Sequence, residues 1–457
     1  MKTLSANVFI KTAFIFLLAS LLFFAPAIGQ HGYSSASIAM GKQQSVQRII
    51  PKPEQIVTPE YFNYHKHNIP QPGRNEAVHL DLRWDNTIVN REMILQVGIT
   101  TGETIGYFDR DAANICLVID RSGSMGGTKM QRTKEAMMTF LKHLQAEDLL
   151  SIVVFDHEVN VLRAPIPVGD KYLVEQTING IQARGSTDLN SGIIAGYRQL
   201  VNNYQRGSTN RVIILTDAMT NTGTLDPEQI IKNAGTYEDG YNVDFTFIGV
   251  GMDINADLAR QLSESKSSTF HFIHDAADID KVFNAEVESL LKKVARNVEL
   301  IIEYGNHLAF KGAFGQPFSS GENEIQFSLN DFNGGLTQVV LASFLQDQAD
   351  KMVKVSLVYD DMRTGKRVSL TQSISTPDGK TTDRDVQKNV TIAQMAVALH
   401  QMAVQYHQGF GGQAQYTLKS AIEVAKESGY AYDPDVNRVL EILQNYAGDL
   451  REIVRKD

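Results

Sequence analysis

The chain of 457 residues is poor in cysteine and carries no excess of positive charge. Its single cysteine excludes an intrachain disulfide framework and a zinc site built from several thiolates. That residue, Cys116, stands inside an apolar run, so we expect a buried, structural thiol rather than a nucleophile. The formal net charge of -9 gives no support to binding of nucleic acid or of an anionic membrane.

Common catalytic motifs are also missing from the expected loops. The stretch from Gly123 to Lys129 is rich in glycine, but it lacks the Gly-Lys-Ser/Thr ending of a phosphate-binding loop. No Gly-x-Ser-x-Gly elbow accompanies the expected strands. The chain also has no set of spanning segments from which a pore could be built. We therefore expect a protein that is not an enzyme and not a channel.

The amino terminus has the composition of a targeting segment. Lys2 and Lys11 flank a polar start, and an uncharged stretch rich in Phe and Leu runs from Thr12 to Ile28. Small residues at Ala25-Pro26-Ala27 predict cleavage, so we assign residues 1–29 to a signal peptide. An uncleaved membrane anchor is the alternative, because the run approaches the ~18–20 residues that span a bilayer. In either case we expect export, to a secreted, periplasmic or envelope-associated location.

Residues 30–75 are expected to form a linker and a short N-terminal segment. Gln30 to Lys52 is polar and without periodicity, which favours a flexible linker. His65 and His67 alternate in a polar loop that offers no partner ligands, so we interpret them as a solvated or locally packed pair. Residues 76–110 contain two alternating strand patterns, which are too few to form a domain alone.

The next region alternates short apolar runs with amphipathic helical patterns. The expected strands lie at 116–119, 149–155, 211–215 and 243–250, with an antiparallel edge strand at 159–164. Helical periodicity is present at 130–144, 190–201, 227–234 and 256–262. Buried strands that alternate with amphipathic helices favour an α/β fold with a doubly wound, mostly parallel sheet, which we place at 111–292.

A change in pattern follows this region. Residues 293–385 alternate apolar and polar side chains between turn signals, which predicts an antiparallel β-domain. We expect the strands of 76–110 to join it, so that the α/β unit is an insertion in the β-domain. Residues 386–457 carry three helical stripes and are expected to be a C-terminal helical region, with Asp433 as an N-cap before Pro434.

Oxygen-bearing side chains follow the ends of three segments of the α/β unit. Asp120, Ser122 and Ser124 come directly after the first buried strand, and their alternate spacing can aim three oxygens the same way. Thr187 precedes a helix, and Asp217 closes a later strand. Ligands of doubly wound sheets gather outside the carboxyl ends of the strands. Hard oxygens with one carboxylate in the first loop suit Mg²⁺, Mn²⁺ or Ca²⁺ rather than Zn²⁺.

This pattern resembles the von Willebrand factor A domain and its metal-ion-dependent adhesion site. The family motif, Asp-x-Ser-x-Ser followed by a Thr and a strand-end Asp, matches Asp120, Ser122, Ser124, Thr187 and Asp217. The resemblance covers about residues 111–292. It implies a divalent cation that the serines bind directly, and that the threonine and aspartates bind directly or through water. An exposed acidic residue of a protein partner would complete the coordination. Mg²⁺ is favoured, and Mn²⁺ and Ca²⁺ remain open.

The flanking residues extend the resemblance. Residues 61–64, 70–72 and 95–99 look like the leader of a family of exported bacterial proteins with an A domain inside a β region. The layout is similar to inter-alpha-trypsin inhibitor heavy chains and to so-called calcium-activated chloride channel homologues. It implies an adhesion or scaffolding protein with a protein partner.

Two other functions stay open. The ion could merely stabilise a structural part of an envelope complex, or a hydrolase could use it. The hydrolase needs a base, and Asp188 is the best candidate, although a residue that opens a helix is more often a cap. Asp156 would either orient the loops of the site or cap its strand end.

Overall fold

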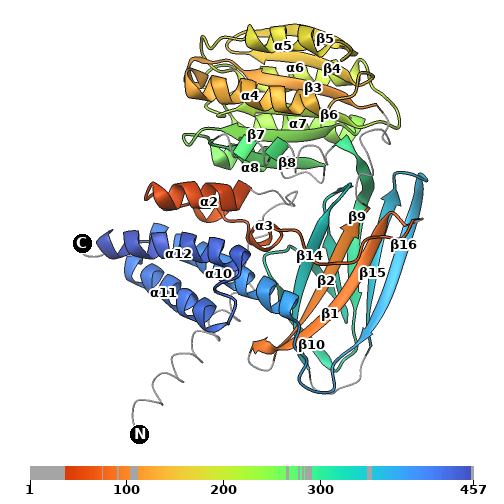
Figure 1. Cartoon of the computed structure of the whole chain (residues 1–457), viewed down its shortest axis with the longest axis vertical. Helices are drawn as coiled ribbons and strands as arrows, with labels where there is room; N and C mark the ends of the chain where they lie inside the picture. The colour runs from red at the N-terminus through yellow and green to blue at the C-terminus, as the bar shows by residue number, and fades with distance from the viewer. Residues whose placement is uncertain are drawn as a thin grey trace.

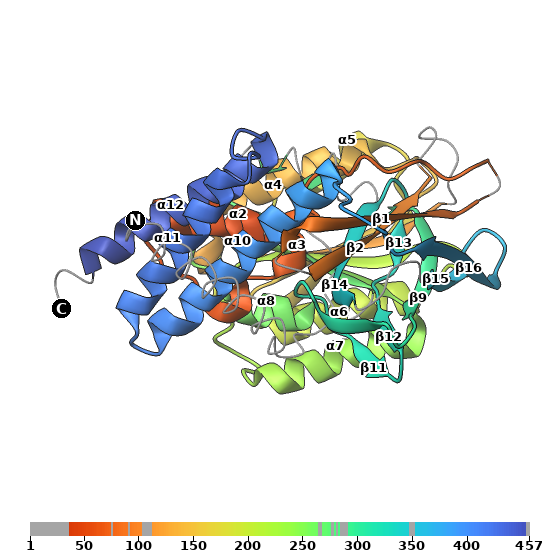
Figure 2. The same cartoon turned by 90° about the horizontal axis from the view of Figure 1, so that it is seen from below.

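A computed structural model describes residues 36–74, 76–89, 92–102, 112–263, 267–275, 278–279, 282–283, 291–346 and 352–453. Figure 1 shows the α/β unit at one end, above a β-sandwich and a group of long helices. In Figure 2 the long helices lie to one side and the sandwich to the other.

The α/β unit is built on one mixed sheet of order β5-β4-β3-β6-β7-β8. All neighbouring strands pair in parallel except the edge strand β5, which is antiparallel to β4. The strands are β3 (Asn114–Asp120), β4 (Leu149–Phe155), β5 (Val159–Pro167), β6 (Asn210–Thr216), β7 (Asp244–Val250) and β8 (Ser268–Ile273). This confirms the predicted fold class, including the antiparallel edge strand. The sequence patterns did not predict β8.

Helices cover both faces of this sheet. Their bounds are η2 (Gly123–Met125), α4 (Thr128–Lys142), α5 (Lys171–Asn179), α6 (Leu189–Val201), α7 (Pro227–Tyr241) and α8 (Ala256–Leu262). One core contains side chains of α4 and α5, and another contains side chains of α6, α7 and α8. Strands β3, β6 and β7 are buried along their whole length, and the centres of β3 and β6 are therefore unbroken apolar runs, Ile115 to Ile119 and Val212 to Leu215. The predictions missed α5, whose apolar face is short.

The α/β unit is an insertion in an antiparallel β-sandwich. One sheet has the order β1-β2-β14-β10, and the other has the order β11-β12-β9-β15-β16 with β13 beside β9. Strand β2, before the insertion, pairs with β14, after it. The strands are β1 (Val78–Val89), β2 (Glu92–Thr101), β9 (Lys293–Glu303), β10 (Leu308–Ala313), β11 (Ser319–Gly321), β12 (Glu324–Ser328), β13 (Phe332–Asn333), β14 (Thr337–Gln346), β15 (Met352–Asp361) and β16 (Lys366–Ser375).

The remaining helices pack against the sandwich and against each other. They are η1 (Pro53–Gln55), α3 (Thr58–Phe62), α10 (Arg384–His407), α11 (Gly411–Glu427) and α12 (Pro434–Ile453). The Asp433 side chain accepts hydrogen bonds from the backbone N–H groups of Asp435 and Val436, as expected for an N-cap. Among the described residues no helix is both long and apolar enough to cross a membrane. The predicted signal peptide at 1–29 lies outside the described residues.

The prediction of a flexible linker at 30–52 is wrong for most of the described residues in that range. Residues Ala36–Val46 form helix α2, which contacts α12 and β8. The helix lacks an apolar stripe because it is enclosed on several sides and buries small and polar residues such as Ser37 and Gly41. A Cβ atom on Gly41 would lie 2.8 Å from the Tyr61 hydroxyl oxygen, so the small residue permits this close approach.

His65 and His67 were expected to be either solvated or locally packed, and the structure shows that they are locally packed. The rings of His65 and His67 lie 4.6 Å apart, and the His67 Nε2 atom is 3.0 Å from the Asn63 side-chain oxygen. Burial lowers the pKa of His65 to about 4 and lowers the pKa of His67 well below its ordinary value. Both imidazoles are therefore neutral parts of the core between α3, β2 and α10.

This burial predicts a loss of stability in mild acid. Unfolded imidazoles bind protons below pH ~6.5, while folded His65 does so only near pH 4. The unfolded state therefore gains protons first, and the free energy of unfolding falls as the pH drops from 7 to 5. We expect His65→Gln to reduce that fall by about 2 kcal/mol in urea titrations. Equal curves for His65→Gln and the wild type would contradict the prediction.

Candidate metal centre

The parallel pairing of β3 with β6 brings two of the predicted ligands to one edge of the sheet. Ile119 pairs with Leu215, so Asp120 and Asp217 both stand just beyond paired strand positions. Both carboxylates are fully buried. Thr216, which the sequence reasoning did not single out, donates its hydroxyl proton to Asp120 Oδ2 over 2.5 Å. Strand pairing therefore fixes the orientation of the Asp120 carboxylate.

The loop after β3 brings the two serines together. The Oγ atoms of Ser122 and Ser124 lie 3.0 Å apart, and the Ser122 backbone N–H donates to Asp120 Oδ1 over 2.8 Å. Ser122 is buried and Ser124 is exposed, so the cluster opens to solvent on the Ser124 side. The Gly123 N–H donates to the Gly185 carbonyl over 2.9 Å, which joins this loop to the loop that carries Thr187.

Thr187 offers a hydroxyl that the described residues leave unused. Its backbone N–H donates to the Asn221 side-chain oxygen over 2.8 Å, and its carbonyl accepts from the N–H groups of Asn221 and Thr222. Its Oγ1 atom is buried and has no hydrogen-bond partner within the described part of the chain. An unpartnered buried hydroxyl is costly unless something else binds it. The sequence reasoning missed Asn221, which follows β6 without a recognisable motif.

A lysine lies against the other aspartate. The Lys129 Nζ atom is 2.7 Å from Asp217 Oδ2 and 2.8 Å from Asp253 Oδ1. The lysine side chain crosses Gly251, where an added Cβ atom would come within 2.6 Å of its Cε. Burial opposes the charged ammonium, but the hydrogen bonds to Asp217 and Asp253 outweigh it and raise the Lys129 pKa. Lys129 therefore balances part of the negative charge at the site.

The donor set fits a hard divalent cation. It consists of two buried carboxylates and three hydroxyl oxygens, one of which has no other use, and such oxygens suit Mg²⁺, Mn²⁺ or Ca²⁺. Burial raises the pKa of Asp120 to about 6 against the opposing hydrogen bonds from Thr216 and Ser122. A bound cation would favour the charged carboxylate at this position.

Comparison with known proteins decides the family of this region. The family model of the von Willebrand factor type A domain matches residues 114–285. Residues 114–285 form a von Willebrand factor type A domain. The A domain thus contains all five residues that the sequence motif singled out.

The similarity to known relatives extends beyond the A domain, but this chain spans only part of the length of those relatives. An uncharacterized protein of Synechocystis is 23% identical over 257 residues, which are 56% of this chain and 59% of that protein. The inter-alpha-trypsin inhibitor heavy chain H2 of Sus scrofa is 29% identical over 283 residues, or 58% of this chain and 28% of that protein.

A solved structure shows the same fold. The structure described as von Willebrand factor type A from Catenulispora acidiphila has a TM-score of 0.53 at 16% identity. It covers 78% of this chain and 87% of that chain, so the likeness of fold extends beyond the A domain.

Asp156 orients the loops of the A domain. It is buried, and its Oδ2 atom accepts from Arg121 Nε over 2.7 Å and from Arg184 Nε over 2.9 Å. Burial opposes the charged form, but the Glu158 backbone N–H and the two guanidinium groups hold the Asp156 pKa below its ordinary value. Arg121 belongs to the serine loop and Arg184 to the threonine loop, so the carboxylate joins both. This favours the loop-orienting interpretation.

Two other acidic residues, Asp156 and Asp188, make contacts that account for them as structural residues of the A domain. Ligand atoms of Asp156, His157 and Glu158 lie within 4.8 Å of one another, but two arginines already neutralise Asp156. Asp188 accepts from the Ser191 backbone N–H over 3.0 Å and from the Ser191 hydroxyl over 2.8 Å. Asp188 is therefore the N-cap of α6, as its position in the sequence suggested.

Removal of the Lys129 charge should destabilise the protein when no divalent cation is present. Lys129→Met leaves the fully buried Asp217 carboxylate without its ammonium partner. We expect a loss of about 2 kcal/mol in the free energy of unfolding in chelator, measured by urea titration. Lys134→Met is the matched control on the same helix and should change it little, because the half-buried Lys134 ammonium binds the neutral Asn179 carbonyl and not a buried carboxylate. A variant at position 129 as stable as the control would contradict this role.

Proposed function

We propose that this chain is an adhesion or scaffolding protein that binds a protein partner through a divalent cation in its A domain. Asp120, Ser122, Ser124, Thr187 and Asp217 would hold the ion. The observation that carries the proposal is the buried Thr187 hydroxyl, which no described residue binds, on a loop that is hydrogen-bonded to the serine loop through Gly185 and Gly123. Mg²⁺ is the favoured ion, because it keeps exchangeable positions for an oxygen donor from outside.

The five proposed ligands would contribute in two ways. Asp120 and Asp217 supply negative charge, while Ser122, Ser124 and Thr187 supply neutral oxygens. A bound cation would offer a coordination position to a carboxylate of the partner. The exposed side at Ser124 is where that carboxylate can approach, because the other four residues are buried.

The proposed setting is outside the cytoplasm. The composition of residues 1–29 supports export, and the α/β insertion supports a domain presented on a separate base. Asp244, at the amino end of β7, contacts Lys293 and Arg296 on β9 of the sandwich, whereas the predicted ligands Asp120 and Asp217 stand at the carboxyl ends of β3 and β6.

Substitution of Thr187 by valine tests whether the site holds an ion. Valine has the shape of threonine without the hydroxyl. In chelator, Thr187→Val should be neutral or stabilising by about 1 kcal/mol, because an unpartnered buried hydroxyl is removed. In isothermal titration with Mg²⁺ or Mn²⁺, the same variant should bind at least about tenfold more weakly than the wild type. An unchanged cation affinity would exclude Thr187 as a ligand.

Partner binding is tested by capture from the native envelope with Mg²⁺ and with chelator. Asp217→Ala should lose the partner under both conditions, as the wild type should in chelator. Asp360→Ala, on β15 of the sandwich, is the control and should keep it. Capture that survives both chelation and Asp217→Ala would contradict the proposal. If Thr187→Val weakens cation binding but capture persists, the ion has a structural role only.

A further inference from the structure

The Asp217 carboxylate of the candidate metal centre is already bound by an ammonium group. The Lys129 Nζ atom lies 2.7 Å from Asp217 Oδ2, and the Met219 backbone N–H donates to Asp217 Oδ1 over 3.2 Å. Asp217 is fully buried and the Lys129 side chain is only 16% exposed, so little water screens the attraction between the two charges. A cation that binds near Asp217 must therefore compete with Lys129 for this charge.

The position of Lys129 is not explained by the stability of its helix. Lys129 is the second residue of α4, and the amino end of a helix carries a partial positive charge that disfavours a basic side chain. Its stem passes over Gly251, where an added Cβ atom would lie 2.6 Å from the Lys129 Cε atom. Gly251 has a φ of +90°, in the left-handed region that favours glycine. The glycine leaves room for the lysine to reach two aspartates, and these contacts account for its place in the chain.

Asp253 gives the ammonium group a second carboxylate. The Lys129 Nζ atom lies 2.8 Å from Asp253 Oδ1 and 2.9 Å from Asp253 Oδ2. The Asp253 side chain is 67% exposed, whereas Asp217 is buried. The ammonium can therefore stay paired with Asp253 when a cation takes over the charge of Asp217.

We propose that Lys129 sets the cation affinity of the site, because its ammonium competes with the ion for the Asp217 carboxylate. The inference rests on the proposed function, which makes Asp217 one of the groups that hold the ion. The interaction between the cation and Asp217 replaces an existing ion pair, so the ion is held more weakly than the five oxygen donors alone would hold it. Partner binding through the ion then depends on the cation concentration over a range that Lys129 determines.

Titration of the full chain with Mg²⁺ by calorimetry tests this inference. Lys129→Met should bind Mg²⁺ at least about tenfold more tightly than the wild type, because no ammonium then opposes the ion at Asp217. Replacement of a residue that only stabilised the fold would weaken the binding or leave it unchanged. Lys129→Arg keeps the positive charge and should bind Mg²⁺ within about threefold of the wild type.

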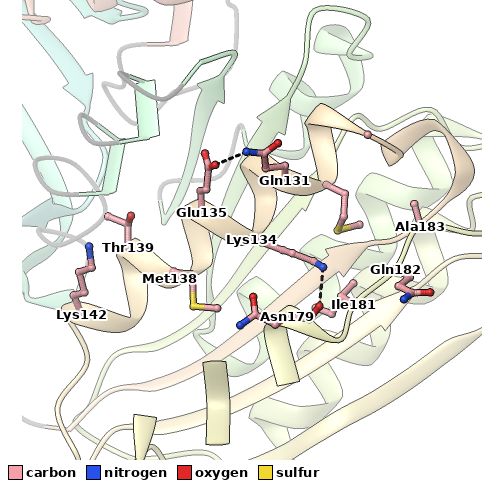
Figure 3. Close-up of a pocket in the computed structure, with 12 residues that line it drawn as sticks. Gln131, Lys134, Glu135, Met138, Thr139, Lys142, Asn179, Ile181, Gln182 and Ala183 are labelled. Atoms are coloured by element: carbon pink, nitrogen blue, oxygen red, sulfur yellow. Dashed lines mark hydrogen bonds between the residues drawn. The ribbon is translucent and has the colours of Figure 1, made fainter. Parts of the chain in front are cut away.

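Lys134→Met is the matched control for the lost positive charge. Figure 3 shows Lys134 on the same helix, where its Nζ atom donates to the neutral Asn179 carbonyl over 2.8 Å. This variant removes an equal charge without freeing a carboxylate, so it should leave the Mg²⁺ affinity unchanged.

Asp253→Asn tests the same competition without the loss of stability expected for Lys129→Met. The Asp253 side chain is exposed, so the variant should fold. Removal of its charge leaves Asp217 to hold the ammonium, and the Mg²⁺ affinity should fall about threefold. In the Lys129→Met background the same change should have no such effect, because no ammonium is left to redirect. Glu135→Gln, which removes an equal charge on α4, is the control.

The outcomes separate this inference from the proposed function. If the wild type binds Mg²⁺ and Lys129→Met binds it no more tightly, the inference is overturned and the cation-dependent function stands. Tighter binding by Lys129→Met without Mg²⁺-dependent capture of a partner would support the inference and overturn the function. Failure of both proteins to bind Mg²⁺ would overturn both. Equal tightening by Lys134→Met, or an unchanged affinity in Asp253→Asn, would overturn the inference.

Discussion

The parallel pairing of β3 with β6 is the interaction on which the candidate metal centre depends. Parallel neighbours end at the same edge of a sheet, so this pairing places Asp120 and Asp217 side by side although they are distant in sequence. The Thr216 hydroxyl then orients Asp120 across the same pair of strands. A change of register by one residue would turn these side chains to the other face and separate the donor set.

Buried carboxylates at this edge need positive charge close by, and three basic side chains provide it. Lys129 forms an ion pair with Asp217, and Arg121 and Arg184 both form ion pairs with Asp156. Each of these cations comes from the loops or the helix that surround the proposed ligands. The same contacts that neutralise the carboxylates therefore also hold the loops around the candidate ligands in place.

At the opposite edge, a buried charge cluster holds the A domain to the sandwich. Asp244 begins β7 and accepts from Arg211 over 2.8 Å and from Arg296 over 2.9 Å, with Lys293 Nζ 3.1 Å away. Burial opposes ionisation, but these three cations hold the Asp244 pKa below its ordinary value. Arg296 and Lys293 belong to β9 of the sandwich. The sheet is thus fixed at its amino ends and presents its carboxyl ends outward.

The sequence by itself determined the features that depend on local pattern. Continuous apolar runs predicted β3, β4, β6 and β7 as buried strands, and the strand-end oxygens at Asp120, Ser122, Ser124 and Asp217 followed from their positions. Alternating patterns on both sides predicted that the A domain is an insertion, which the pairing of β2 with β14 confirms.

Only the tertiary structure decided the rest, because it depends on contacts between distant residues. Helix α2 has no periodic stripe, since several elements enclose it. Lys129 meets Asp217 across 88 positions of the chain, and Thr216 meets Asp120 across 96. No local pattern records which lysine will neutralise which carboxylate, or which hydroxyl will remain without a partner. Those are results of packing, and they determine the charge and the open side of the site.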